Sequence, residues 1–248
     1  MTAAARVLDH ARSIYREKGT RELLTSVGSH LGRRLGMTIG KRADFLRRKA
    51  LIDRQFDQRC GTDTGGVQNL FTLTIAGSNA LHGGTHIAVD PAEFAEGIDA
   101  LGIDPSAFTF VDLGSGKGRA VLLAAEHGFC KVIGVEFARE LHDVALSNVA
   151  TFGNTHPGLA TRIQLLHADA ATFEMPPAPT VLFLFNPFDA VICRQVARNA
   201  MDSWRRHPRP IHIFYMYPVE AQTFIEEGWH ITKRARPYAL LEPATLSA

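Results

Sequence analysis

A glycine-rich turn between an apolar run and a helical pattern holds the residues whose types and spacing could bind a small ligand. Residues 110–112 end the apolar run in an acid, and Gly114, Gly116 and Gly118 follow at every second position. Glycine adopts positive φ and lets the backbone approach a ligand, while a helix N-terminus offers free N–H groups. The turn is therefore predicted to bind a nucleotide-like ligand.

A second acid stands where the next strand is expected to end. Residues 132–135 form another apolar run, and Glu136 follows them, 18 positions after Gly118. At this distance a carboxylate at a strand tip meets the ribose hydroxyls of a ligand bound at the first turn. We therefore expect Glu136 to bind a ribose.

Two common nucleotide-binding motifs are excluded by single residues. The dinucleotide pattern needs a third glycine where Arg119 stands, and the phosphate-binding loop needs Ser or Thr after Lys117, where Gly118 stands. The remaining pattern, Asp-Leu-Gly-Ser-Gly-x-Gly at residues 112–118, resembles the first motif of the class I S-adenosylmethionine-dependent methyltransferases.

This resemblance implies S-adenosylmethionine as the cofactor and gives roles to residues along the chain. Asp112 would order the turn and the methionine amino group, Glu136 would hold the ribose hydroxyls, and Phe137 would pack on adenine, with core packing as its alternative. Asp169 would accept from the adenine amino group. The expected cofactor-binding residues are Asp112, Gly114, Ser115, Gly116, Gly118, Glu136, Phe137, Asp169, Ala170 and Asn186.

The expected catalytic residues, Asn186, Pro187 and Phe188, follow the fourth strand of the predicted domain. They resemble the start of the Asn-Pro-Pro-aromatic motif of amine and amide methyltransferases, in which Asn and a Pro carbonyl receive the acceptor's N–H groups. Here the second Pro is missing and the aromatic residue comes one place early, so a nitrogen acceptor is favoured only marginally. The alternative is that Asn186 caps the following helix.

A narrower resemblance covers residues 112–119 and 134–136. These two segments are similar to the non-SET histone lysine methyltransferases and their bacterial relatives. The resemblance implies no histone substrate.

The elements that must position these residues alternate along the chain. After a helix at 91–102 capped by Asp90, strands are expected at 109–113, 131–135, 162–167, 180–185 and 210–217, and helices at 117–127, 138–151, 190–206 and 219–227. Such alternation predicts an α/β fold: a doubly wound, mostly parallel, seven-stranded sheet of the Rossmann-like methyltransferase type, with a terminal antiparallel hairpin at 229–241.

The first 60 of the 248 residues differ in charge from the rest. They carry 14 Lys and Arg against 6 Asp and Glu, and they show helical stripes such as Phe45, Ile52 and Phe56. We expect a basic helical extension at 1–60 and a methyltransferase domain at 61–248. A helical cover over the domain is the favoured role for the extension, with peripheral membrane contact and nucleic-acid binding as alternatives.

The remaining chemistry-bearing residues are expected to have structural roles. Three cysteines without metal spacing and no signal peptide favour a reduced, cytoplasmic protein. No metal site is expected, because His82 and His86 flank glycines and lack an acidic third ligand. Lys117 is expected to be solvated, and Tyr215 and Tyr217 to pack in the core.

The sequence leaves the acceptor and the oligomeric state open. A methyltransferase acting on a protein or small molecule is the favoured function. The alternatives are a non-catalytic S-adenosylmethionine-binding scaffold and a nucleic-acid methyltransferase, the latter ranked lower because the aromatic residues of the extension already lie on apolar stripes.

Overall fold

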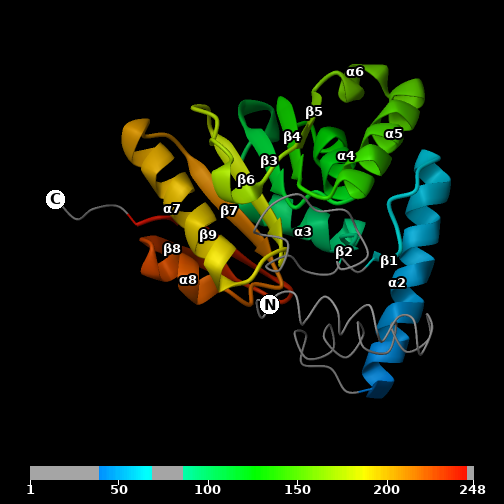
Figure 1. The fold of residues 1–248 in the computed structure, drawn as a ribbon, viewed down its shortest axis with the longest axis horizontal. Coiled ribbons are helices and arrows are strands. Elements are labelled where there is room, and N and C mark those ends of the chain that lie inside the picture. The colour runs from blue at the N-terminus through cyan, green and yellow to red at the C-terminus, as the bar shows by residue number, and fades with distance from the viewer. Residues whose placement is uncertain (1–38, 69–85, 245–248) are drawn as a thin grey trace, which may run out of the picture.

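The computed structural model describes residues 39–68 and 86–244, which are built around one seven-stranded sheet (Figure 1). Its strands lie in the order β5-β4-β3-β6-β7-β9-β8; β3 to β7 are parallel, and β9 is antiparallel to both β7 and β8. They are β3 (Thr109–Leu113), β4 (Lys131–Glu136), β5 (Ile163–His167), β6 (Thr180–Phe185), β7 (Ile211–Met216), β8 (Trp229–Arg234) and β9 (Tyr238–Pro243). The predicted doubly wound sheet with a terminal hairpin is confirmed.

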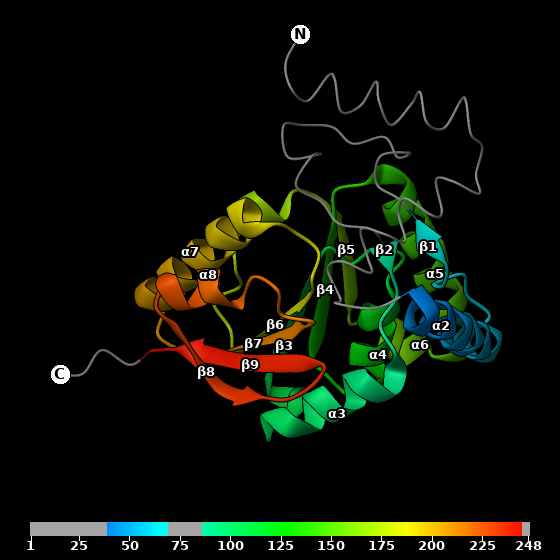
Figure 2. The same cartoon turned by 90° about the horizontal axis from the view of Figure 1, so that it is seen from below.

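Helices cover both faces of this sheet (Figure 2). One face is covered by α3 (Pro91–Leu101), α4 (Arg119–Glu126) and α5 (Arg139–Thr155), and the other by α7 (Ala190–Arg206) and α8 (Ala221–Glu226). Neighbouring side chains of one strand enter opposite cores: Phe110 packs on the α3 side, and Val111 packs on the α7 side. The short helices are η3 (Pro105–Ala107), α6 (Pro157–Ala160) and η4 (Ala170–Thr172).

The helix ends follow local signals in the sequence. Asp90 caps α3 as predicted, because its carboxylate accepts from the Ala92 N–H over 2.9 Å. Helix α4 begins at Arg119, two residues later than predicted, because Gly118 has φ 89° and belongs to the turn.

The described part of the basic extension is α2 (Ile39–Cys60), which confirms its predicted helical character. Phe56 and Cys60 are buried in the same core as α3 and α4. After α2, β1 (Val67–Gln68) pairs antiparallel with β2 (His86–Ile87). The part of the predicted helical extension before residue 39 lies outside the described residues.

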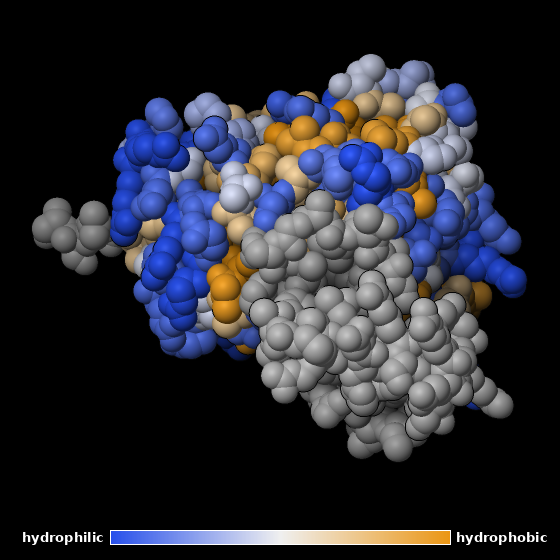
Figure 3. Space-filling view, in the orientation of Figure 1, coloured by the Kyte–Doolittle hydropathy of each residue, from blue (hydrophilic) through white to orange (hydrophobic). Residues whose placement is uncertain are grey.

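The side of the molecule formed by α7 and α8 is mostly hydrophilic (Figure 3). Arg194 of α7 forms ion pairs with Glu226 and Glu227, and Arg198 also pairs with Glu227. Over residues 39–68 and 86–244, none of the helices combines the length and the apolar character that crossing a membrane requires.

Candidate active site

The glycine turn joins β3 to α4 at the carboxyl edge of the sheet. The N–H groups of Gly114 and Ser115 both donate to the Val135 carbonyl, over 2.9 and 3.0 Å, which ties the turn to β4. Gly114, Gly116 and Gly118 have φ values of 84°, 54° and 89°. All three lie in the left-handed region that favours glycine, so the predicted reason for glycine at these positions is confirmed.

Two of these glycines also lie where a side chain would collide with a neighbour. A Cβ at Gly114 would come within 2.8 Å of the Pro187 Cβ. A Cβ at Gly116 would come within 2.2 Å of the His86 Nδ1. The turn is therefore enclosed between the residues after β6 and the start of β2.

A cavity opens between the turn and the ends of β3, β4 and β6. Eight of the predicted site residues line it: Asp112, Gly114, Ser115, Gly116, Glu136, Phe137, Pro187 and Phe188. Asp169 and Ala170 line a second cavity, which shares Gly114, Phe137 and Phe188 with the first. Segments separated by up to 76 positions are thus brought together at one edge of the sheet, as the topology predicted.

Two predicted site residues lie beside these cavities without lining them. Gly118 precedes α4, and Asn186 follows β6 with φ 44°. Helix α7 is capped by Asp189, whose carboxylate accepts from the N–H groups of Val191 and Ile192. The alternative in which Asn186 caps this helix is therefore wrong. Asn186 instead accepts from the Tyr215 hydroxyl over 3.5 Å.

The carboxyl groups of Asp112 and Glu136 belong to residues that are both only 3% exposed. Burial raises the pKa of Asp112 well above its ordinary value, and the nearby Glu136 adds to this shift. Burial also raises the pKa of Glu136, to about 7. Such shifts occur where acids face a low-dielectric cavity, and they are common in functional sites.

Glu136 already connects the turn to β4. Its Oε2 accepts from the Gly116 N–H over 2.7 Å, and its Oε1 accepts from the Ala138 N–H over 2.8 Å. The Phe137 backbone also contributes a hydrogen bond to this carboxylate, which has about four lone-pair sites. Glu136 can therefore hold the turn and still accept from hydroxyl groups in the cavity.

Asp169 has a local structural role in addition to its place at the second cavity. Its Oδ1 accepts from the Ala171 N–H over 2.8 Å, which caps the short helix η4. This contact fixes the carboxylate at the end of β5, where the residue lines the second cavity.

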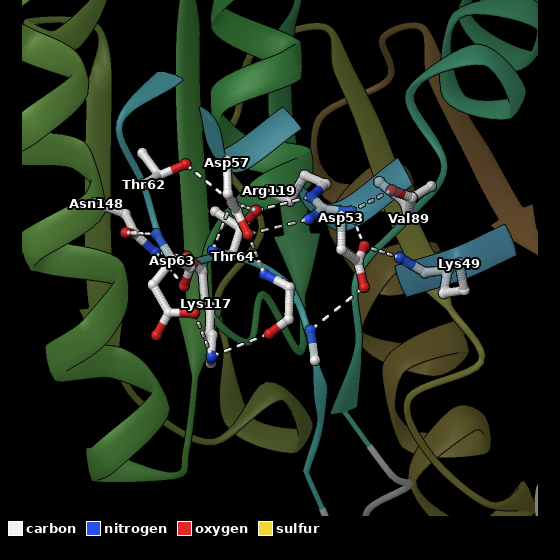
Figure 4. A network of polar contacts seen from close by, with 12 residues as sticks. Lys49, Asp53, Asp57, Thr62, Asp63, Thr64, Val89, Lys117, Arg119 and Asn148 are labelled. Atoms are coloured by element: carbon white, nitrogen blue, oxygen red, sulfur yellow. Dashed lines mark hydrogen bonds and ion pairs between the residues drawn. The ribbon is translucent and has the colours of Figure 1, made fainter. Parts of the chain in front are cut away.

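A network of charges, which sequence reasoning missed, joins α2 to the start of α4 (Figure 4). Arg119, 2% exposed, forms ion pairs with Asp53 and Asp57 of α2, and its Nε donates to the Thr64 hydroxyl over 2.8 Å. Lys49 also pairs with Asp53. Although burial opposes ionisation of Asp53, its contacts with Lys49 and Arg119 hold its pKa below the ordinary value.

Lys117 belongs to the same region, and its predicted solvation is wrong. It is 5% exposed, and its Nζ donates to Asp63 Oδ1 over 2.9 Å and to the Gly65 carbonyl over 3.0 Å. Asn148 of α5 donates to the carbonyls of Lys117 and Asp63, both over 2.9 Å. Residues 63–65 therefore fold over the side chain that would otherwise meet water.

The two tyrosines at the carboxyl end of β7, Tyr215 within the strand and Tyr217 just after it, differ in their surroundings. Tyr215 is fully buried in the core, as predicted. Tyr217 is half-buried, stacks on Phe185, and its hydroxyl donates to Glu93 over 3.2 Å. Burial raises the pKa of both phenols.

The residues around the cavity fit S-adenosylmethionine, the cofactor that the sequence implies. Two buried polar atoms of the lining, His86 Nε2 and Ser115 Oγ, have no hydrogen-bond partner among the residues described. A ligand with both N–H and O–H donors would satisfy such a lining.

A comparison with protein families agrees with this assignment. Residues 111–209 match the family model described as a methyltransferase domain. No curated protein matches the chain. Among solved structures, it is similar to a ribosomal protein L11 methylase from Lactobacillus delbrueckii subsp. bulgaricus, at 19% identity and TM-score 0.41, covering 60% of this chain and 74% of that one.

Two further solved structures show similarity of the same order. An RNA methyltransferase from Salinibacter ruber in complex with S-adenosyl-L-homocysteine has 16% identity and TM-score 0.43, with 65% of this chain and 95% of that chain covered. A glycopeptide N-methyltransferase complexed with S-adenosyl-L-methionine has 12% identity and TM-score 0.46, with coverage of 61% and 92%.

The family match begins within β3 and ends just after α7. It therefore contains the glycine turn, both buried acids and Asn186. Residues 111–209 therefore match a methyltransferase domain, and the sheet order around them is that of the Rossmann-like methyltransferase fold.

Proposed function

We propose that the protein transfers the methyl group of S-adenosylmethionine to a nitrogen atom of a protein or small-molecule acceptor. The observation that carries the nitrogen acceptor is the position of Asn186 at the carboxyl end of β6, next to Pro187 and Phe188, which line the cofactor cavity. The amide oxygen of Asn186 can accept from an N–H group. The contact with Tyr215 orients this amide.

The backbone conformation after β6 and β7 supports the same location for the acceptor. Asn186 and Tyr217 are the non-glycine residues with positive φ in the described part of the chain, at 44° and 48°. They follow the neighbouring strands β6 and β7. Such conformations are uncommon in non-glycine residues, and they cluster at active sites and ligand-binding segments. The carboxyl ends of these two strands are therefore the proposed acceptor side.

A third cavity supports an acceptor path beside the cofactor cavity. It shares Ala88 and Phe185 with the cofactor cavity, and its lining includes Glu93 and Tyr217. Burial raises the pKa of Glu93, and the neighbouring Asp90 adds to this shift. The Glu93 carboxyl is thus suited to receive a proton from an acceptor amine that arrives protonated.

The cofactor-binding residues are proposed with the roles that the sequence implied for Asp112, Glu136, Phe137 and Asp169. The roles of Ser115 and Ala170 are added from their places in the two cavities. Asp112 and Ser115 hold the methionine end with the backbone of the turn, and Glu136 holds the ribose hydroxyls. Phe137 and Ala170 enclose the adenine, and Asp169 accepts from its amino group. Asp112, Ser115 and Glu136 line the first cavity, whereas Asp169 and Ala170 line the second, and this separation supports the assignment.

The proposed chemistry depends mainly on alignment. When bound, S-adenosylmethionine supplies an activated methyl group and leaves as S-adenosylhomocysteine. Asn186 and Pro187 would hold the acceptor nitrogen, and Phe188 would exclude water. Holding two reactants in line contributes about 7–11 kcal/mol in favourable cases, so no strong nucleophile from the protein is needed.

The proposal also covers the N-terminal extension at residues 1–60 and the similarity to the non-SET histone lysine methyltransferases. We treat residues 1–60 as an extension of a methyltransferase domain at 61–248, with α2 packed on that domain. The similarity of residues 112–119 to the non-SET histone lysine methyltransferases concerns the cofactor motif, and it adds nothing to the choice of acceptor.

The test is transfer of a labelled methyl group together with cofactor affinity. The purified protein, incubated with S-adenosylmethionine labelled on its methyl group and fractionated cell extract, is expected to label an N-methylated product. Asn186→Ala is expected to reduce turnover at least tenfold while changing cofactor affinity less than threefold. The exposed Asn154 provides the matched control, Asn154→Ala, which should change neither.

Other outcomes would contradict specific parts of this proposal. Product methylated on oxygen or carbon would overturn the nitrogen acceptor, and equal loss of turnover and affinity in Asn186→Ala would overturn the acceptor role of Asn186. Cofactor binding without labelling of any fraction would favour the non-catalytic alternative. Labelled nucleic acid would favour the alternative in which the protein is a nucleic-acid methyltransferase.

A further inference from the structure

One ring nitrogen in the cofactor cavity is enclosed without a partner. His86 begins β2 and lines the cavity that contains Asp112 and Glu136. The residue is partly exposed, but its Nε2 is buried and has no hydrogen-bond partner within the described segments. A buried acceptor left in this state costs about 1–3 kcal/mol, so the site favours a ligand that donates to it.

The hydrogen bond on the other side of the ring fixes which nitrogen carries the proton. A hydrogen bond with the Thr64 backbone raises the pKa of His86, which assigns the accepting role to the Thr64 carbonyl. Because Nε2 has no partner within the described segments, Nδ1 is assigned as the donor. The neutral ring therefore presents a bare lone pair at Nε2. Burial, with Lys117 as the largest neighbouring charge, lowers the pKa of His86 to about 4, so the ring is neutral at pH 7.

Thr64 is itself held by the network that joins α2 to α4. Its N–H donates to Asp57 Oδ1 over 2.8 Å, and its hydroxyl accepts from Arg119 Nε over 2.8 Å. The carbonyl that orients His86 is therefore fixed from both α2 and the start of α4 (Figure 4).

The position of His86 selects one end of the cofactor. The ring lies against Gly116, in the cavity that holds Asp112. Asp169 and Ala170, the residues proposed for adenine, line the second cavity, to which His86 does not contribute. Of the N–H donors of the cofactor, the methionine α-amino group is therefore the one on the side of His86.

We infer that His86 Nε2 accepts a hydrogen bond from the α-amino group of the bound cofactor, and that α2, through Asp57 and Thr64, positions this acceptor. The inference rests on the proposed function, because it requires the cofactor in this cavity. It makes a segment outside the matched family region part of the cofactor site.

The test compares two ligands that differ in the amino-acid part. S-adenosylhomocysteine carries the α-amino group, whereas 5′-methylthioadenosine lacks the whole amino-acid part. Their affinities for the full-length chain are measured by isothermal titration for wild type, His86→Ala and His86→Gln. The exposed His230 on β8 gives the matched control, His230→Ala.

His86→Ala is expected to weaken S-adenosylhomocysteine binding about tenfold or more, as for a hydrogen bond to a charged group, and to change methylthioadenosine binding less than threefold. His86→Gln, which retains an acceptor, is expected to recover part of the loss. Equal weakening of both ligands, or of neither, would overturn the inference while leaving the proposed function intact. Wild type that binds neither ligand would overturn the proposed function and the inference together.

A second measurement does not depend on a substituted protein. In wild type, the side-chain ¹⁵N resonances of His86 are expected to show the Nδ1-protonated form. The Nε2 resonance should shift on addition of S-adenosylhomocysteine and stay in place with methylthioadenosine. A protonated Nε2 in the free protein, or the same shift with both ligands, would contradict the inference.

Discussion

The imidazole of His86 lies directly against the backbone of Gly116, and a Cβ at this glycine would come within 2.2 Å of the ring Nδ1. The N–H of Gly116 donates to Glu136 on the other side. One glycine of the turn therefore connects the segment before α3 with the acid at the end of β4. Glycine is required at this position for two reasons: φ is positive, and a side chain would collide with His86.

Comparing an alanine at Gly116 with an alanine at another glycine of positive φ should separate backbone strain from the collision with His86. Gly116→Ala is expected to weaken S-adenosylmethionine binding at least tenfold, because the new methyl group displaces His86 or the turn. Gly128→Ala is the control: its φ of 89° adds comparable strain of about 1–2 kcal/mol, but nothing lies within 4 Å of the new Cβ. Both variants should lose stability in denaturant unfolding, and only Gly116→Ala should lose affinity in titration. Retained affinity in Gly116→Ala would contradict the close packing of His86 on the turn.

The raised pKa of Glu136 predicts how cofactor affinity depends on pH. Ribose hydroxyls donate to the ionised carboxylate, and the pKa is about 7, so affinity should rise from pH 6 to pH 7 and level off above pH 8. In Glu136→Gln the part of this rise that belongs to Glu136 should disappear. Titrations of both proteins across this range measure it. The same profile in both proteins would rule out a role for Glu136 ionisation.

The raised pKa of Glu136 also predicts how the stability of the ligand-free protein depends on pH. The folded-state pKa of Glu136 is above its value in the unfolded chain, so the folded state binds more protons between about pH 4.5 and pH 7. The free energy of unfolding of wild type, relative to Glu136→Gln, should therefore fall by about 3 kcal/mol as pH rises through this window. Urea unfolding of the two proteins at pH 5 and pH 8 measures the difference; a constant difference would contradict it.

The buried network between α2 and α4 should be costly to break. Asp53→Ala leaves two buried cations, Lys49 and Arg119, without their shared carboxylate, and is expected to destabilise the fold by roughly 3–5 kcal/mol. Asp202→Ala removes an exposed ion pair with Arg205 and should cost less than about 1 kcal/mol. Urea unfolding measures both. Similar small losses in the two variants would mean that the network does not hold α2 on the domain.

The fold was predictable because its signals are local. The apolar runs at 109–113 and 180–185 form strands with those bounds, and Asp90 caps α3 as expected. The glycine spacing also predicted the turn geometry. These signals depend on residues a few positions apart, which a single sequence shows directly.

The remainder of the site depends on contacts between distant segments. Arg119 meets Asp53 across 66 positions, and Lys117 is buried because residues 63–65 fold over it. A charged residue in a first helical turn normally meets water, so the pattern predicted solvation. His86 drew attention only as half of an i, i+4 histidine pair; its contact with Gly116 has no signature in the spacing.

The most direct test of the central claim is an equilibrium titration of the full-length chain with S-adenosylmethionine. Wild type is expected to bind, while Gly116→Arg and Glu136→Ala should bind at least tenfold more weakly. Gly158→Arg, at a glycine with nothing within 4 Å of a Cβ, should bind like wild type. Equal binding by wild type and both site variants, or no binding by wild type, would contradict the assignment of this cavity to the cofactor.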